Sequence, residues 1–242
     1  YDSQFEFNGE GNNLLSQLIT IITPDAADLE VSQVNQPDSI LPGQEVTINY
    51  MVKNVGPNTA VGTIRDAGYF SEDIDFDASV DHLLETRDNY INLEPGDSVM
   101  RSVTAQMPGV LPGGYIGVAR TNTTQSIFED NFGNNLAFSD DSIFVTIKEL
   151  QLTVPDTAEL NYRDKLFWKV TVGANLDMLI DLFSTSPVGF NEIYVAYDRI
   201  PTPDDYDYSH PVAAGTEHQV LVPTTQEGNS LVSASNGQAH TR

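Results

Sequence analysis

The sequence contains no cysteine and few basic residues. Lys and Arg together number 11 against 35 Asp and Glu, which gives a formal net charge of −24 over 242 residues. Without cysteine, the chain can form neither a disulfide framework nor a thiolate site for metal or redox chemistry. An acidic surface of this kind repels the phosphates of nucleic acids and of anionic membranes, so neither is an expected partner.

Long apolar runs and helical patterns are also missing. A membrane-spanning helix needs about 20 apolar residues, and the longest candidate, "LLSQLITII" (14–22), is short and interrupted by polar residues. No membrane insertion of this segment is therefore expected. The chain starts at Tyr1, with no basic region followed by an apolar one, which predicts that it is a segment of a longer protein.

Alternation of apolar and polar residues runs through most of the chain. In "EVTINYMVK" (45–53) the apolar residues at every second position share one face, as in a half-buried strand. The same pattern occurs at 143–147, 166–172 and 193–197. Turn segments such as "EPGDS" (94–98) separate these runs. The sequence predicts an all-β protein made of antiparallel β-sandwiches.

One pattern occurs twice. "SQFEFNGEGNNL" (3–14) and "SIFEDNFGNNL" (126–136) share S-x-F-E and GNNL, and Ser3 and Ser126 lie 123 residues apart. This period is close to the size of one sandwich domain. We therefore expect residues 1–24 to end a preceding repeat, residues 25–149 to form a complete repeat, and residues 150–242 to form a domain of another kind.

Residues 25–149 carry a family resemblance. "ADLEVSQVNQPDSILPGQEVTINYMVKNVGPNTA" (27–60), "GYFSEDIDFDASVDHLL" (68–84), "LPGGYIGVARTN" (111–122) and "FEDNFGNNL" (128–136) occur in the order typical of the CARDB domain. The segment thus resembles this cell-adhesion module of bacterial surface proteins. The resemblance implies an immunoglobulin-like sandwich in a tandem array.

The remaining third resembles another family. "LQLTVPDTAELNYRDKLFWKVTV" (150–172), "NEIYVAYDRIPTPDDYDY" (191–208) and "VLVPTTQEG" (220–228) are similar to the bacterial pre-peptidase C-terminal (PPC) domain. This resemblance implies a jelly-roll-like, non-catalytic sandwich attached to secreted proteins. The family's final strand is not evident in "GNSLVSASNGQAHTR" (228–242), so we expect a C-terminal truncation that leaves one sheet edge unpaired.

The densest acidic cluster is "SEDIDFDASVD" (71–81), which has no basic residue. Its carboxylates match positions 1, 3, 5 and 9 of an EF-hand loop: Asp73, Asp75, Asp77 and Asp81. The positions that require Gly and Glu hold Ala78 and Leu84 instead. Two interpretations stay open: a calcium site with its own geometry, calcium being the sole expected cofactor, or a solvated loop.

Two further segments offer ligand groups. Glu129 and Asp130 in "FEDNFGNN" (128–135) form a weaker metal candidate, while the Asn and Gly residues there also suit a tight turn. In "PTPDDYDYSH" (201–210), Tyr206, Tyr208 and Asp207 combine aromatic rings with a carboxylate, as a sugar site requires. The alternative is a loop whose tyrosines pack onto the sheet.

No enzyme motif is present. The four histidines lie outside any HExxH pattern, and there is no GxSxG elbow or phosphate-binding loop. Carboxylates brought together by folding leave no local pattern, so a glycoside hydrolase is not excluded by sequence. The sequence favours a non-catalytic adhesion or spacer segment of an extracellular or cell-surface repeat protein, which contacts neighbouring domains and a surface protein or glycan. The alternative is an accessory carbohydrate-binding region of a secreted hydrolase.

Overall fold

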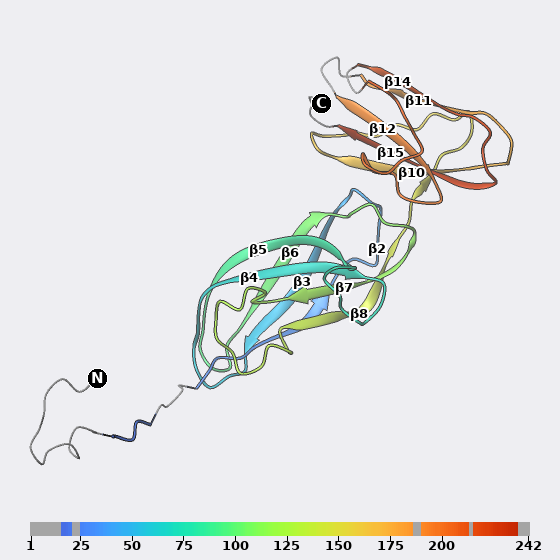
Figure 1. The fold of residues 1–242 in the computed structure, drawn as a ribbon. Helices are drawn as coiled ribbons and strands as arrows, with labels where there is room; N and C mark the ends of the chain where they lie inside the picture. Colours follow the sequence, from blue (N-terminus) through green and yellow to red (C-terminus); the bar gives the residue numbers. More distant parts are fainter. Residues whose placement is uncertain (1–15, 21–24, 186–189, 213–214, 237–242) are drawn as a thin grey trace, which may run out of the picture.

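The computed structural model describes residues 16–20, 25–185, 190–212 and 215–236, and these contain β-strands and no helix. Consequently no described segment is a helix able to cross a membrane. The strands form two successive β-sandwiches (Figure 1), so the predicted all-β fold is confirmed. Of the predicted end of a preceding repeat, residues 1–15 and 21–24 lie outside the described residues. Within 16–20 there is no strand, and Leu18 and Ile19 are 94% and 80% exposed.

The first sandwich consists of a three-stranded and a five-stranded sheet, in the orders β1-β3-β6 and β2-β8-β7-β4-β5. All neighbours are antiparallel except β2 and β8, which are parallel. The order matches the immunoglobulin type predicted from the sequence. Its strands are β1 (Leu29–Asn35), β2 (Ser39–Ile40), β3 (Glu45–Asn54), β4 (Ala60–Ser71), β5 (His82–Leu93), β6 (Ser98–Gln106), β7 (Gly113–Arg120) and β8 (Leu136–Val145).

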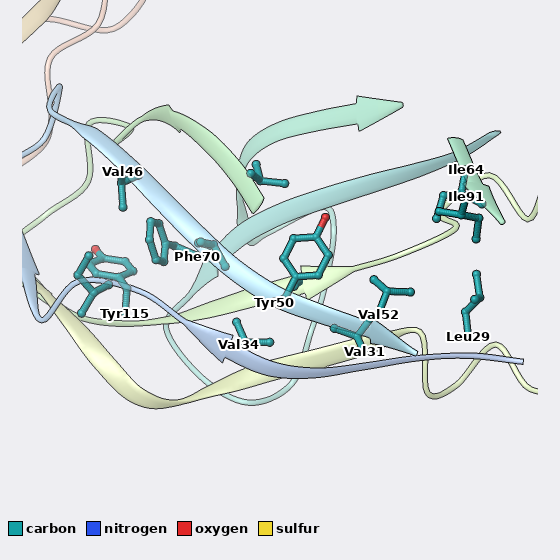
Figure 2. Packing of buried hydrophobic residues seen from close by; sticks show 14 of the residues in the cluster. Leu29, Val31, Val34, Val46, Tyr50, Val52, Ile64, Phe70, Ile91 and Tyr115 are labelled. Carbon is teal, nitrogen blue, oxygen red and sulfur yellow. The ribbon is translucent and has the colours of Figure 1, made fainter. Parts of the chain in front are cut away.

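The core of this sandwich follows the alternation of β3. The four apolar residues predicted to share a face are all buried: Val46, Ile48, Tyr50 and Val52. Figure 2 shows the Tyr50 ring among aliphatic side chains of the core, with Phe70 nearby. Burying such a side chain contributes about 1.5–3 kcal/mol, so the alternation in β3 determines which face of the strand the core covers.

The second sandwich has a five-stranded sheet in the order β13-β12-β15-β10-β9 and a two-stranded sheet of β11 and β14. Its core lies between them and includes Val170, Ile193, Val220 and Val232. The strands are β9 (Lys148–Glu149), β10 (Lys165–Val172), β11 (Met178–Phe183), β12 (Asn191–Tyr197), β13 (Tyr208–Ser209), β14 (Glu217–Val222) and β15 (Gly228–Asn236).

Residues 228–236 correct one expectation. The sequence pattern predicts no final strand there and an unpaired sheet edge. Instead these residues form β15, the central strand of its sheet, which pairs with β10 on one side and β12 on the other. Alternation places Leu231 on one face and Val232 on the other, and both are buried. Because the strand is covered on both faces, its sequence does not alternate simply between polar and apolar residues.

The two sandwiches are joined by two residues. β8 ends at Val145 and β9 begins at Lys148, so only Thr146 and Ile147 separate the sheets. The Thr146 N–H donates to the Ile40 carbonyl of the first sandwich (3.1 Å). β9 belongs to the second sandwich, where it is an edge strand that pairs in parallel with β10. Ile147, predicted as a strand residue, lies in this connection and is buried there against Phe167 and Leu231.

Candidate functional site

The acidic loop between β4 and β5 is organised by its own carboxylates. Asp73 Oδ1 accepts the Asp75 N–H (2.8 Å), and Asp81 Oδ2 accepts the Asp77 N–H (2.9 Å). Asp77 Oδ1 accepts both the N–H (2.8 Å) and the hydroxyl (2.7 Å) of Ser79. These Ser79 hydrogen bonds lower the pKa of Asp77. The carboxylates thus stabilise consecutive turns.

A metal ion needs several ligands that converge. Within the described part of the chain, no three His, Asp or Glu side chains are grouped closely enough to hold one. The residues predicted for calcium lie in one exposed or half-exposed loop whose oxygens bond its own N–H groups. Calcium binding by Asp73, Asp75, Asp77 and Asp81 stays a prediction.

Glu129, the weaker metal candidate, lies inside the first sandwich. Only 3% of its surface is exposed. Oε2 accepts the N–H of Leu29 (2.5 Å), while Oε1 accepts the side-chain amides of Asn122 (2.5 Å) and Asn135 (2.9 Å). Three N–H donors surround one carboxylate, so this side chain ties β1 to the turn before β8. Adjacent Asp130 is exposed, and its N–H donates to the Ala27 carbonyl (3.2 Å).

A second buried carboxylate was not singled out by sequence. Asp66 in β4 is fully buried and accepts hydrogen bonds from the Thr121 hydroxyl (2.6 Å) and the Asn89 amide (2.9 Å). It lies near Tyr50, whose pKa is raised by burial first and by the charge of Asp66 second. Both buried acids of this sandwich therefore have structural partners.

The predicted sugar-binding segment lines a groove in the second sandwich, with a volume of about 530 Å³. Tyr206, Tyr208 and Asp207 lie along it together with Tyr197 and Arg199. The opposite wall comes from the β14–β15 connection: Thr224, Thr225 and Gln226. The structure thus brings all three predicted residues to one groove that combines aromatic rings with hydroxyl and amide groups.

Arg199 holds this segment in place. Its guanidinium bonds Asp205 (3.0 Å) and Asp207 (2.8 Å) at once. Asp207 Oδ2 also accepts the Tyr197 N–H (2.8 Å). The Arg199 hydrogen bonds lower the pKa of Asp207. The Tyr206 ring packs on Tyr194 with centroids 5.1 Å apart. Both oxygens of Asp207 therefore accept hydrogen bonds that stabilise the loop, and only their remaining lone pairs could accept hydrogen bonds from a ligand.

One of the described histidines is buried and the others are half-exposed. His218 is 2% exposed, and its ring meets that of His210 edge to face at 4.9 Å. His210 Nδ1 lies 3.0 Å from the Gln219 carbonyl. His82 contacts the ring of Tyr115 at 6.0 Å, and His240 lies outside the described residues. Exposed and buried positions alternate along β14, and His218 occupies a buried position between two exposed polar residues.

Comparison with known proteins gives no family by sequence: neither a family model nor a curated protein matches the chain. Among solved structures, the chain is similar to the CARDB domain of a Pyrococcus furiosus protein in complex with di-metal ions. The identity is 21%, the match covers 51% of this chain and 98% of that one, and the TM-score is 0.37. A solution structure of that domain has 20% identity, and the match covers 50% of this chain and 97% of that one at a TM-score of 0.36.

A β-glucosidase from Erythrobacter marinus is also similar, with 15% identity over 50% of this chain and 16% of that chain, at a TM-score of 0.33. Each of these matches covers about half of the chain. The PPC-like character of residues 150–242 stays a prediction.

Proposed function

We propose that the chain is a non-catalytic segment of a large extracellular repeat protein, in which it acts as an adhesion and spacer module. The junction between the two sandwiches is the observation that carries this proposal. A spacer must transmit orientation from one domain to the next, and a connection of two residues, with Ile147 buried, leaves little freedom for bending.

Close contacts support a stiff junction. A Cβ at Gly43, whose φ is +85°, would lie 1.9 Å from the Lys165 carbonyl oxygen of the other sandwich. A Cβ at Gly109 would lie 2.8 Å from both Ile200 and Phe167. At Gly43, glycine alone permits the two backbones to approach this closely, and at Gly109 the contacts are with side chains. The Gln106 amide adds a hydrogen bond to Asp164 across the junction (2.7 Å).

Charge supports an extended arrangement of repeats. The net charge of −24 makes neighbouring acidic domains repel one another, which disfavours folding back of an array. Calcium in the acidic loop at 71–81 would reduce that repulsion, and we include calcium binding in the proposal on this ground. The repeated S-x-F-E and GNNL patterns support an array rather than a single module.

Small-angle X-ray scattering of the whole chain tests the spacer function. We expect one interdomain arrangement to account for the profile at low and at physiological salt, because the junction is packed and hydrogen-bonded rather than held by charge alone. A profile that requires many interdomain orientations would contradict a spacer function.

A second candidate, an accessory carbohydrate-binding region, is favoured by the groove that contains Tyr206 and Tyr208. Aromatic faces stack on the apolar face of a sugar, while hydroxyl and amide groups bond its hydroxyls. Titration of neutral oligosaccharides into the whole chain tests this candidate. Binding that is lost in Tyr206→Ala and kept in Tyr90→Ala, an exposed tyrosine of the first sandwich, would support it. Equal binding by both variants would reject it.

A further inference from the structure

A cleft of about 390 Å³ lies at the junction of the two sandwiches. The first sandwich contributes Gly43 and the segment 106–109, and the second contributes residues of β10, β12, β15 and the 200–203 loop. This volume suits a ligand the size of a few sugar or amino-acid residues. Because both sandwiches line it, the cleft exists only while the junction is formed.

The register of the second sandwich determines the floor of this cleft. Phe167 pairs with Ser233, and Ser233 pairs with Tyr194, so these three side chains form one row across the sheet. Lys165 pairs with Ser235 in the next row of the same face, since residues two apart on a strand point the same way. Aromatic rings, hydroxyl groups and an ammonium group therefore share one face of the sheet.

Two positive charges occur here in a chain that has few. Arg163 and Lys165 both line the cleft and are exposed, and neither forms an ion pair with another described residue. The intervening Asp164 is engaged by the Gln106 amide (2.7 Å) and the Asn161 N–H (2.9 Å). The Asp164 carboxylate thus accepts hydrogen bonds from Gln106 and Asn161 and forms no ion pair with Arg163 or Lys165.

The guanidinium of Arg163 contacts the aromatic ring of the preceding residue. Its carbon lies 5.1 Å from the centroid of the Tyr162 ring, a cation–π contact. Arg163 also has φ of +71°, a left-handed conformation that is uncommon for residues other than glycine. Glu192 lies across Ser235 from Lys165 and accepts a long hydrogen bond from that serine (3.4 Å), so one opposing carboxylate shares this row of the sheet.

We propose that this cleft binds a carboxylated sugar, a uronic acid residue of an acidic polysaccharide. The apolar face of the sugar would lie on the half-buried ring of Tyr194, and its carboxylate would bond Arg163 and Lys165. Phe167 is buried against Ile147 and Leu231 and belongs to the packed junction beside this ring. Ser233, Ser235 and Thr202 also line the cleft. The Ser233 hydroxyl donates to the Pro201 carbonyl (3.3 Å) and the Ser235 hydroxyl to Glu192 (3.4 Å), so these two can serve the sugar hydroxyls only as acceptors. Arginine and lysine are the side chains that bond carboxylates most strongly, and the aromatic floor distinguishes a sugar ring from a simple anion.

This inference goes beyond the spacer function and concerns a site other than the groove containing Tyr206 and Tyr208. The net charge of −24 repels polyanions at long range. Binding therefore depends on short-range contacts in the cleft, and affinity should respond to the two cations there. A ligand held by both sandwiches would also stabilise the junction by mass action.

Isothermal titration of the whole chain with trigalacturonate, and with its neutral methyl ester, tests the proposal. We expect trigalacturonate to bind and the ester to bind at least about tenfold more weakly, because charge-assisted hydrogen bonds are lost. The double variant Arg163→Gln/Lys165→Gln should weaken trigalacturonate binding by at least about tenfold. The matched control Lys53→Gln/Arg87→Gln removes two exposed cations of the first sandwich and should leave it unchanged.

Three outcomes would overturn the proposal. These are no binding of trigalacturonate, equal weakening by both double variants, and equal binding of a triglutamate peptide, which would indicate carboxylate recognition without a sugar. Amide shifts in the NMR spectrum locate the ligand: changes at Ser233 and Ser235 are expected, and changes confined to the first sandwich would also overturn it. Scattering of the unliganded chain tests the spacer function separately.

Discussion

Replacing Glu129 tests the structural role of its buried carboxylate most sharply. In Glu129→Ala, three donors lose their acceptor: the Leu29 N–H and the side-chain amides of Asn122 and Asn135. Leaving a buried donor unpaired costs about 1–3 kcal/mol, so three amount to about 3–9 kcal/mol before water enters the space. A domain of this size has a total stability of about 5–15 kcal/mol. The first sandwich should therefore lose at least about 3 kcal/mol and approach its unfolding limit.

The assay uses the whole chain with two probes. Trp168 is the only tryptophan and lies in β10, so its fluorescence reports on the second sandwich, while far-ultraviolet circular dichroism reports on both. Glu129→Ala should lower the urea midpoint of the circular dichroism transition that belongs to the first sandwich. The fluorescence transition, which reports on the second sandwich, should keep its midpoint. Glu129→Gln keeps one oxygen for Asn122 and Asn135 but turns an NH₂ toward the Leu29 N–H, so a smaller loss is expected.

Asp130→Asn is the matched control for this experiment. It removes one negative charge at the neighbouring position, but Asp130 is exposed, so stability should change by no more than about 0.5 kcal/mol. Equal unfolding midpoints for Glu129→Ala and Asp130→Asn would refute the reasoning, since the loss would then follow charge rather than the buried acceptor.

Three more predictions concern the junction, pH and calcium. Gly43→Ala should separate the unfolding transitions of the sandwiches by placing Cβ 1.9 Å from the Lys165 carbonyl. Gly96→Ala, with a similar φ of +89° but open space around it, adds the backbone strain alone and should separate them less. The Arg199 hydrogen bonds lower the folded pKa of Asp207, so their contribution is present above the unfolded value of about 3.9 and is lost as pH falls through the folded pKa. The difference between the urea midpoints of the second sandwich at pH 7 and at pH 3 should be smaller in Arg199→Gln than in the unaltered chain. Calcium should raise the melting temperature of the parent by several degrees and leave unchanged the variant with Asp73, Asp75 and Asp77 changed to Asn; a purely solvated loop gives no rise in either.

The strands of the first sandwich could be predicted because one face of each is buried. Alternation in β3 marks the inward residues, and both Val46 and Val52 lie where the pattern puts them. In the second sandwich the same rule worked only in part. Phe167 belongs to the polar phase of β10, yet it is buried at the junction because that sheet is covered on both faces.

The repeated FE and GNN patterns drew attention to Glu129, but its role could not be deduced from local sequence. The carboxylate bonds the N–H of Leu29, which is 100 residues away, and only folding brings the two together. The spacing of acids and amides favoured a turn over metal ligation but did not indicate a buried carboxylate. The junction cleft was missed for the same reason, since Gly43, Arg163 and Ser233 come from three distant segments.

A distance measurement across the junction tests the spacer claim most directly. Because the chain has no cysteine, Ser98→Cys with Ala174→Cys, both at exposed positions, gives one spin-labelled pair that spans the two sandwiches. Double electron–electron resonance should give a single narrow distance distribution in the otherwise unaltered chain. Adding Gly43→Ala should broaden it, and adding Gly96→Ala should not. A broad distribution before either glycine is changed would contradict the account, because a mobile junction cannot transmit orientation from one domain to the next.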